Sequence, residues 1–421
     1  MHLNSSVQNY LDSDAKIIAP VQHIAELPLV VKGAEGPYIV SVDDKRYLDF
    51  TSGACTMSLG YNAPAKLGFG SFPFPYAVGI NQIEYAKALV KKFPGGQRAQ
   101  IAFSVCGSDT NDAAIKFSRA YTGRKKIVTF EGDYHGTTFG AASLTTLPGR
   151  ISDKFAPMVG EIYAMPFCNE EDSDEKVDAV IDKIKALNCE EIAGFIIEPI
   201  QGDMGMLPMN KKLMKKIYAL SREFNIAFIV DEVQMAFYRT GPFFSIENYE
   251  GIYPDAITLG KHIGGGIPLG AILGRYDFMQ SLGPCEHAFS MAGNSEACAR
   301  GLYNLNAIEN EQFQKGLHRN IKILLNTLAS FKDKYPQIVV KFTGIGLAYG
   351  LWVKSNNISD TDDKACQKII AKAFDYGLYT MRIGSNWIRL EPPLNLDEKL
   401  LIEGLAILEK AIADYSLGRL N

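Results

Sequence analysis

Short apolar runs alternate with amphipathic stretches through the middle of the chain. The runs are rich in Ile, Val, Phe or Ala and are bounded by glycine, proline or charged residues, which is typical of buried strands. The expected strands are Ile101–Ser104, Lys126–Phe130, Gly194–Ile197, Ala227–Val230, Ala256–Leu259 and Leu269–Leu273. Apolar residues at helical spacing predict helices between them at Asn111–Tyr121, Lys176–Leu187 and Lys211–Phe224. This alternation predicts an α/β fold in which helices flank both faces of a large, mostly parallel sheet.

The rest of the chain mixes long helical patterns with short strands, which predicts an α+β arrangement. The helices are expected at Asn294–Glu309, Glu311–Lys334, Lys364–Tyr376 and Asp397–Asp414, and the strands at Ile338–Phe342, Leu347–Val353, Leu378–Arg382 and Trp387–Leu390. Near the N-terminus, Tyr38–Val42 and Arg46–Phe50 predict a hairpin. A chain of 421 residues is long enough for two domains. We expect residues 51–310 to form a large domain, and residues 1–50 and 311–421 to form a smaller domain built from both chain ends.

Composition and charge argue against several classes of protein. The chain is 47% hydrophobic and 21% charged, with a net charge of −4, and so lacks the basic character that nucleic-acid binding requires. Seven scattered cysteines without a C-x-x-C pair predict neither a disulfide framework nor a metal site. The sequence shows neither a signal peptide nor an apolar stretch approaching the ~18 residues of a membrane helix. We therefore expect a cytoplasmic protein that binds neither membrane nor nucleic acid.

Polar residues follow several expected strands, at the edge where α/β proteins bind ligands. Gly107 and Ser108 lie between a strand and a helix, where free backbone N–H groups suit a phosphate. The alternative is that Ser108 or Asp109 only caps the helix, which is the commoner use of such residues. Asp231 follows a buried strand, where a carboxylate needs a partner: a metal, a nucleotide-bound cation or a protonated ring nitrogen. The nucleotide is disfavoured because no G-x-x-x-x-G-K-[ST] motif is present.

A lysine and an aromatic residue follow two further strands. Lys261 precedes the glycine run Gly264–Gly266, where desolvation favours the neutral amine that forms imines, although a surface lysine is the commoner case. Tyr134 could stack on a flat heterocycle, and the adjacent His135 is expected to be hydrogen-bonded within the fold. Together these positions supply a phosphate cradle, a stacking aromatic, a carboxylate and a Schiff-base lysine. Those are the parts of a pyridoxal phosphate (PLP) site.

At these residues the chain resembles the class III (subgroup II) PLP-dependent aminotransferases of fold type I. The resemblance extends from about Tyr38 to Leu394, and its most specific stretches are Phe228–Gln234, Arg239–Gly241 and Asp255–Gly270. It implies PLP as cofactor and an amino acid and an oxo acid as substrates. It also implies a homodimer with the active site at the subunit interface.

The resemblance implies roles for individual residues as well. Lys261 would hold PLP as a Schiff base, and Asp231 would pair with the protonated pyridine nitrogen. Val233 and Tyr134 would pack on the two ring faces, and Gln234 would approach the ring hydroxyl. The remaining positions are Gly107, Ser108 and Asp109 at the phosphate, Ser290 at the phosphate of the neighbouring subunit, and Arg389 at a substrate carboxylate.

One branch of the family carries out a different reaction. Asp203 stands where many ω-aminotransferases have Glu, and it resembles the amino-acid racemases and isoleucine 2-epimerases, as does the segment Gly107–Asp112. Gln234, in contrast, is the aminotransferase residue.

Three hypotheses follow. The first, narrowly favoured because most members of the family are aminotransferases, is amino-group transfer between an amino acid (or ω-amino acid) and a 2-oxo acid, with Lys261 moving the Cα proton. The second is a racemase or epimerase in which Lys261 and Asp203 act on opposite faces of Cα. The third is a catalytically silent PLP-binding protein, against which the retention of Lys261 and Asp231 counts.

Overall fold

The computed structural model describes residues 4–17, 26–62, 79–356, 361–384 and 386–420. The chain divides into two compact units. The small unit comprises residues 1–63, 312–342 and 349–421, and the large unit comprises residues 64–311 and 343–348. No helix within the described ranges is long and apolar enough to cross a membrane.

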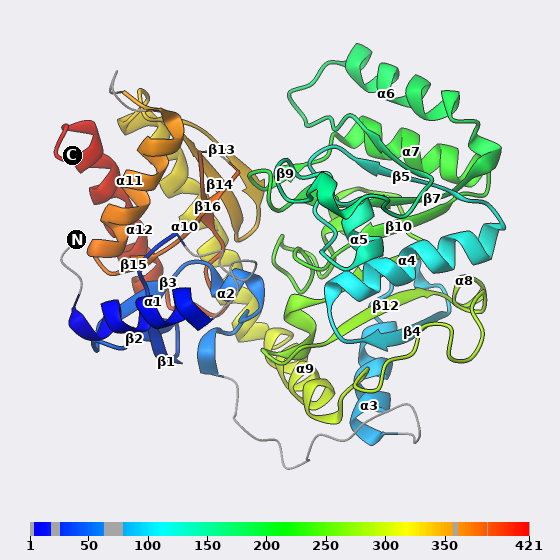
Figure 1. Ribbon diagram of the computed structural model, residues 1–421, viewed down its shortest axis with the longest axis horizontal. Helices are drawn as coiled ribbons and strands as arrows, with labels where there is room; N and C mark the ends of the chain where they lie inside the picture. Colours follow the sequence, from blue (N-terminus) through cyan, green and yellow to red (C-terminus); the bar gives the residue numbers. More distant parts are fainter. Residues whose placement is uncertain (1–3, 18–25, 63–78, 357–360, 385, 421) are drawn as a thin grey trace. The chain divides into compact units, whose positions relative to one another are not determined.

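A seven-stranded sheet forms the centre of the large unit (Figure 1), in the order β4-β12-β11-β10-β7-β5-β6. Its strands are β4 (Ala99–Ser104), β5 (Lys126–Phe130), β6 (Ile162–Met165), β7 (Ile192–Ile197), β10 (Ala227–Asp231), β11 (Ala256–Leu259) and β12 (Gly270–Arg275). Strand β12 is antiparallel to both of its neighbours, and the other adjacent pairs are parallel. The predicted α/β fold is therefore confirmed, and each of the six expected strands is present. The patterns missed β6, an edge strand in which only Met165 is buried.

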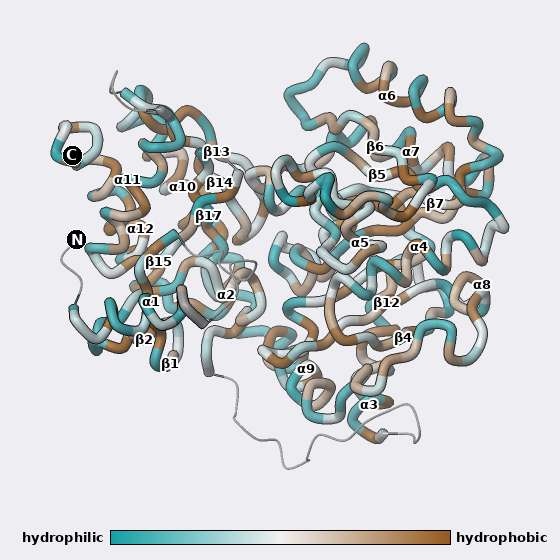
Figure 2. Tube along the Cα trace, in the orientation of Figure 1, coloured by the Kyte–Doolittle hydropathy of each residue, from teal (hydrophilic) through white to brown (hydrophobic). Residues whose placement is uncertain are grey.

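Burial explains why the central strands read as continuous apolar runs. Every residue of β7 and β10 is buried, because helices cover both faces of a mostly parallel sheet. The helices themselves are amphipathic: α6 (Asp174–Ala186) buries Val177, Val180, Ile181 and Ile184. Figure 2 shows the same alternation of apolar and polar positions along α6 and α7 (Lys211–Glu223), which pack against each other.

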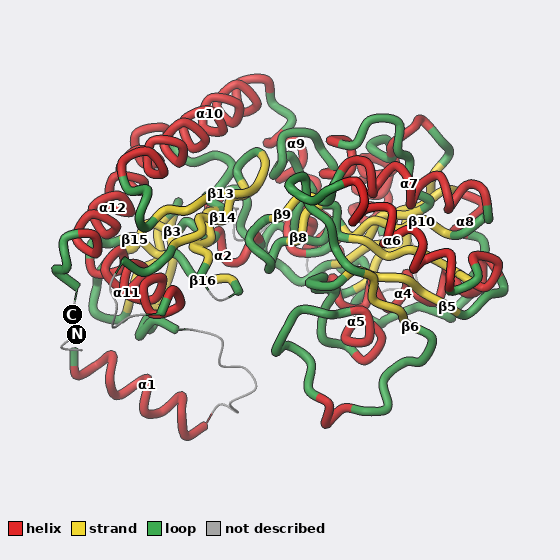
Figure 3. The backbone as a smooth tube through the Cα atoms, turned by 90° about the horizontal axis from the view of Figure 1, so that it is seen from above, coloured by secondary structure: helices red, strands yellow, loops and turns green. Residues whose placement is uncertain are grey.

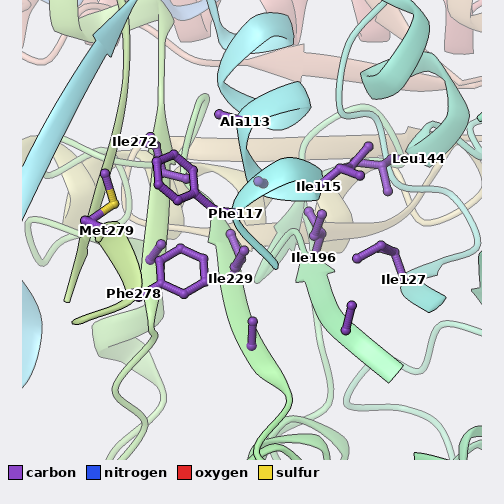
Figure 4. Packing of buried hydrophobic residues seen from close by; sticks show 14 residues of the cluster. Ala113, Ile115, Phe117, Ile127, Leu144, Ile196, Ile229, Ile272, Phe278 and Met279 are labelled. Atoms are coloured by element: carbon purple, nitrogen blue, oxygen red, sulfur yellow. The ribbon is translucent and has the colours of Figure 1, made fainter. Parts of the chain in front are cut away.

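Helix α4 (Gly107–Thr122) packs across β7, β10, β11 and β12. Figure 4 shows its side chains among those of the strands in one apolar cluster, which includes Ile115, Phe117, Ile196, Ile229 and Ile272. Fully burying an aliphatic or aromatic side chain of this size contributes about 1.5–3 kcal/mol. The cluster therefore fixes the start of α4 over the carboxyl ends of the central strands.

The remaining elements of the large unit are short or peripheral. The helices are α3 (Ile80–Val90), α5 (Phe139–Leu144), α8 (Tyr276–Met279) and α9 (Ser295–Ile308), and a small hairpin is formed by β8 (Ile200–Gln201) and β9 (Leu207–Pro208).

The small unit contains two four-stranded sheets. One has the order β1 (Val31–Glu35), β2 (Tyr38–Ser41), β3 (Arg46–Asp49), β15 (Leu378–Tyr379), and the other has the order β13 (Val339–Ile345), β14 (Ala348–Val353), β17 (Trp387–Leu390), β16 (Arg382–Ile383). The predicted hairpin is the antiparallel pair β2–β3. Its second strand pairs with β15, so one sheet contains residues from both ends of the chain.

Helices complete the small unit. They are α1 (Ser5–Ile17), the short α2 (Ser52–Cys55), α10 (Glu311–Lys334), α11 (Asp362–Asp375) and α12 (Glu398–Ser416). Helices α11 and α12 pack against each other and against β15 (Figure 3).

The expected strand Leu378–Arg382 is wrong as a single element. The chain pairs with β3 at β15 and then with β17 at β16, so the segment belongs to two sheets. Between them Thr380 is fully buried, and its hydroxyl donates to the carbonyl of Arg389. The continuous apolar pattern does not reveal this change of sheet, because it depends on strands distant in the sequence.

Candidate active site

Asp231 and Lys261 lie at the same edge of the large sheet. Asp231 is the last residue of β10, and Lys261 follows the neighbouring parallel strand β11 after Gly260. Asp231 is only 5% exposed, and its Oδ2 accepts hydrogen bonds from Asn111 Nδ2 and His135 Nδ1, each at 2.7 Å. Its Oδ1 accepts the backbone N–H of Val233 at 2.9 Å. A carboxylate offers about four acceptor positions, so these bonds leave Oδ1 one position for a further donor.

The amine of Lys261 is held by Gln234. Its Nζ donates to Gln234 Oε1, and the residue has a φ of 44°, in the left-handed region that a lysine rarely adopts. Burial and the charges of Arg239 and Lys261 lower the pKa of His262 to about 3. The neutral ring of His262 donates from Nε2 to the Gln234 carbonyl at 2.6 Å. Gln234 is thus fixed at its backbone and at its side chain, which defines where the lysine amine lies.

Glycines create a space at the start of α4. A Cβ on Gly107 would lie 2.6 Å from Val233 Cγ1, and one on Gly260 would lie 3.0 Å from the Gly107 nitrogen. Gly136, with a φ of +127°, would bring a Cβ within 2.3 Å of Ser108 Oγ. At the start of α4, Gly107 therefore lies against Val233, and the Ser108 hydroxyl lies against Gly136. This is an arrangement that suits an anion.

Asp109 is used as a helix cap. Its carboxylate accepts the backbone N–H groups of Val105 at 3.0 Å and Cys106 at 2.9 Å, and the residue is 7% exposed. Because this cap satisfies backbone groups at the helix start, α4 begins four positions earlier than the expected Asn111. The phosphate hypothesis therefore depends on Gly107 and Ser108 more than on Asp109.

Tyr134 lies within the electrostatic influence of Asp203. The half-buried Tyr134 donates its backbone N–H to Glu198 Oε1 at 2.6 Å, and the Arg150 guanidinium lies 5.6 Å from its ring centroid. Burial, and next the charge of Asp203, raise the pKa of the Tyr134 hydroxyl. Asp203 itself is half-buried, in the turn between β8 and β9.

The contacts described above include neither Ser290 nor Arg389. Ser290 is exposed in the segment between α8 and α9. Arg389 belongs to β17 of the small unit, where it is 4% exposed and lies 3.5 Å from the buried carboxylate of Glu391.

The sequence patterns missed a buried polar cluster behind Asp231. Asp133 and Glu198 are both buried, and His135 connects Asp133 to Asp231. Burial and the charges of Asp133 and Asp231 raise the pKa of Glu198 well above its ordinary value. Only the spacing of Asp133 and His135 after β5 hints at the cluster in the sequence. Across the described ranges, no group of three or more His, Cys, Asp or Glu side chains could hold a metal ion.

The arrangement fits PLP: a helix N-terminus for the phosphate, an acceptor position on buried Asp231 for the pyridine nitrogen, and a positioned lysine amine. A family model of the class-III aminotransferases matches residues 20–412. The chain belongs to this family. The class-III enzymes are PLP-dependent, and the chain is accordingly a PLP-dependent enzyme.

Relatives in the family carry out different reactions. The chain is 31% identical to a leucine/methionine racemase of Thermococcus litoralis over 98% of its length and 97% of that protein. It is 29% identical to the isoleucine 2-epimerase of Lentilactobacillus buchneri, covering 98% and 96% of the two chains. A 5-aminovalerate aminotransferase of Pseudomonas putida is 30% identical, covering 92% and 94%. A Virgibacillus transaminase structure superposes with a TM-score of 0.86 at 24% identity, covering 97% and 99%, which supports the fold.

Proposed function

We propose that this class-III enzyme is an amino-acid racemase or epimerase that inverts Cα, with Lys261 and Asp203 as proton carriers on opposite sides of the cofactor ring. The substrate proposed is an α-amino acid with an apolar side chain, because the leucine/methionine racemase and the isoleucine 2-epimerase, at 31% and 29% identity, are slightly more similar to this chain than an alanine/serine racemase at 28%. We further propose residues 51–310 as the large PLP-binding domain, and residues 1–50 and 311–421 as a small domain built from both chain ends.

The positions of the two carriers relative to Val233 and Tyr134 are the observation that carries this proposal. Gly260, which precedes Lys261, lies against Val233, since a Cβ added to the glycine would be 3.1 Å from Val233 Cγ1. Asp203, in contrast, is near enough to Tyr134 for its charge to raise the pKa of the tyrosine. If Val233 and Tyr134 pack on the two ring faces, then Lys261 is associated with one face and Asp203 with the other.

Gln234 contacts Lys261 and the residue that precedes Asp203. Its Oε1 accepts from Lys261 Nζ, and its side-chain amide lies against Gly202, since a Cβ added to that glycine would be 2.7 Å from Nε2. One side chain therefore contacts one proposed carrier and the neighbour of the other.

The remaining residues are assigned by their chemistry. PLP bound through Lys261 supplies an electron sink for the electron pair that Cα retains when it loses a proton. Asp231 provides the negative charge facing the pyridine nitrogen, Gly107 and Ser108 bind the phosphate, and Gln234 approaches the ring hydroxyl. Arg389 binds the substrate carboxylate with its guanidinium fork. The amino group of the substrate would first replace the Lys261 amine on the cofactor. The released amine would then take the Cα proton from one side, and the Asp203 carboxyl group, after taking up a proton from water, would supply it to the other.

The experiment follows single L-amino acids in deuterated water without an oxo acid. A racemase accumulates the D-isomer with deuterium at Cα over many turnovers, and Asp203→Asn abolishes the inversion while PLP stays bound. Glu131→Gln, which changes an exposed carboxylate in a neighbouring loop, serves as the matched control and keeps the inversion. If no D-isomer forms from any apolar amino acid tried, the racemase assignment is wrong.

Amino-group transfer is the second candidate, and it is supported by Gln234 and by the aminotransferase relatives. In that reaction Lys261 alone moves the proton, and an oxo acid receives the amino group. The same experiment distinguishes it: turnover stops after one half-reaction per cofactor and resumes when an oxo acid is added.

We also propose a homodimer in which Ser290 of each subunit approaches the phosphate of the other. The exposure of Ser290 in the segment between α8 and α9 is compatible with this role. Light scattering of the purified protein gives the oligomeric state. If the enzyme is active as a monomer, the proposed role of Ser290 is wrong.

A further inference from the structure

Asp231, His135 and Asp133 form a chain of three buried charged side chains. His135 Nδ1 donates to Asp231 Oδ2 at 2.7 Å, and its Nε2 lies 3.4 Å from Asp133 Oδ2. The side chains of His135 and Asp133 have no exposed surface, and that of Asp231 is 4% exposed. The imidazole is therefore enclosed between two carboxylates.

Asp133 is fixed by donors from two elements, β5 and β8. Its Oδ2 accepts the backbone N–H of Phe130 at 3.1 Å and the hydroxyl of Thr129 at 3.2 Å. Its Oδ1 accepts Gln201 Nε2 at 2.8 Å, from the hairpin that carries Asp203. Because these donors replace water around the carboxylate, Asp133 can carry a charge at a position without solvent.

The charges of this cluster can be counted. Although burial opposes it, hydrogen bonds to Asp133 and Asp231 raise the pKa of His135 to about 10, so the ring is an imidazolium at neutral pH. Burial and the charges of the same two carboxylates raise the pKa of the neighbouring Glu198. Within the chain Asp133–His135–Asp231, two carboxylates and one imidazolium leave a single net negative charge, which matches one protonated ring nitrogen. Without the charge of Asp133 the cluster would be neutral, and nothing would balance the proton on that nitrogen.

We propose that Asp133 is a positioning residue that holds the imidazolium of His135 and thereby leaves Asp231 a full negative charge for the pyridine nitrogen of PLP. The proposal rests on the assignment of Asp231 to that nitrogen, made above. It applies equally to a racemase and to an aminotransferase, because both need the ring as an electron sink.

The test uses the enzyme loaded with PLP labelled with ¹⁵N in the ring, and the ¹⁵N chemical shift reports whether that nitrogen is protonated. The wild type is expected to give a protonated signal, and Asp133→Asn a signal shifted toward the unprotonated nitrogen. In metal sites, mutation of a residue that hydrogen-bonds to a ligand side chain typically lowers the affinity for the metal about 10- to 100-fold. Binding of PLP to the Asp133→Asn apoenzyme should weaken by a similar factor.

Asp255→Asn is the matched control. Asp255 is a buried carboxylate of the same unit, 2% exposed, and is paired with Arg222 and Arg275. Its loss should lower folding stability without changing the ¹⁵N signal. If Asp133 has only a structural role, Asp133→Asn should likewise lower folding stability without changing the ¹⁵N signal.

The possible outcomes separate the two assignments. If Asp231→Asn leaves the ¹⁵N signal unchanged, the assignment of Asp231 in the proposed function is wrong. If Asp231→Asn shifts the signal but Asp133→Asn does not, only the role of Asp133 is overturned. Should Asp133→Asn fail to fold, Thr129→Val replaces it, because the Thr129 hydroxyl contacts both Asp133 and His135 Nε2. An unshifted signal in that variant also overturns the proposal.

Discussion

The contact between Gly107 and Val233 can be tested by adding a single methyl group. In Gly107→Ala the new Cβ would lie 2.6 Å from Val233 Cγ1 and 2.9 Å from Cγ2, whereas ordinary contacts begin at 3.4 Å. Relief of the closest contact requires a movement of roughly 0.8 Å (3.4 − 2.6). Overpacking of this kind costs about 1–3 kcal/mol, and the better helix propensity of alanine offsets at most about 1 kcal/mol of it.

The cost should appear mainly in cofactor binding, because Val233 is the side chain expected against one ring face. If about 1.4 kcal/mol falls on binding, the affinity for PLP drops tenfold. Titration of the apoenzyme with PLP, followed by absorbance, measures this affinity, and thermal unfolding of the apoenzyme measures stability separately.

Gly404→Ala provides the matched control. Gly404 lies in α12 of the small unit, and a Cβ added to it would lie 2.4 Å from Phe50 Cζ. This clash is comparable, and it involves none of the proposed PLP-binding residues. Gly404→Ala should lower the unfolding temperature and leave the affinity for PLP within about twofold, since a structural clash away from the site changes only folding. If Gly107→Ala also binds PLP normally, Val233 does not pack on the ring and the site is wrongly assigned.

Four further predictions follow from the site. Lys261→Ala should lose both the visible imine absorption and turnover, which a spectrum and an activity assay check together. Asp231→Asn should lower turnover by about 10²- to 10⁴-fold with little change in folding, as measured by steady-state kinetics and circular dichroism. Arg389→Ala should raise the KM by the equivalent of about 1.5–3 kcal/mol with turnover less affected. Folding stability should decline in alkali, as denaturant titrations at several pH values would show. His135 contributes fully to the free energy of unfolding at pH values below its ordinary pKa of 6.5, and this contribution is lost as the pH rises through about 10. Glu232, whose pKa burial raises from 4.5 to about 8, acts in the same direction.

The part of the site that the sequence predicted depends on local signals. Asp231 and Lys261 could be recognised because each follows a short apolar strand, and the carboxyl ends of parallel strands meet at one edge of a sheet. Gly107 and Ser108 could be recognised because they precede a helix. The spacing of apolar residues could not predict the first residue of α4, since the start of this helix depends on Asp109 accepting two backbone N–H groups.

The part that was missed depends on contacts between distant segments. Asp133 and Gln201 are 68 positions apart, and Asn111 and Asp231 are 120 positions apart, so no local pattern joins them. The same reason explains why Leu378–Arg382 was predicted as one strand. Its two halves pair with β3 and β17, and the sequence contains no signal for the change of partner.

The small unit balances the charge of Arg389 with a residue of its own. A buried guanidinium such as that of Arg389 needs a negative neighbour. Glu391, which directly follows β17 and has a fully buried side chain, lies 3.5 Å from Arg389. The proposed binding of a substrate carboxylate by Arg389 is common to both candidate reactions. The deuterium experiment with Asp203→Asn, and not the charge of Arg389, therefore distinguishes them.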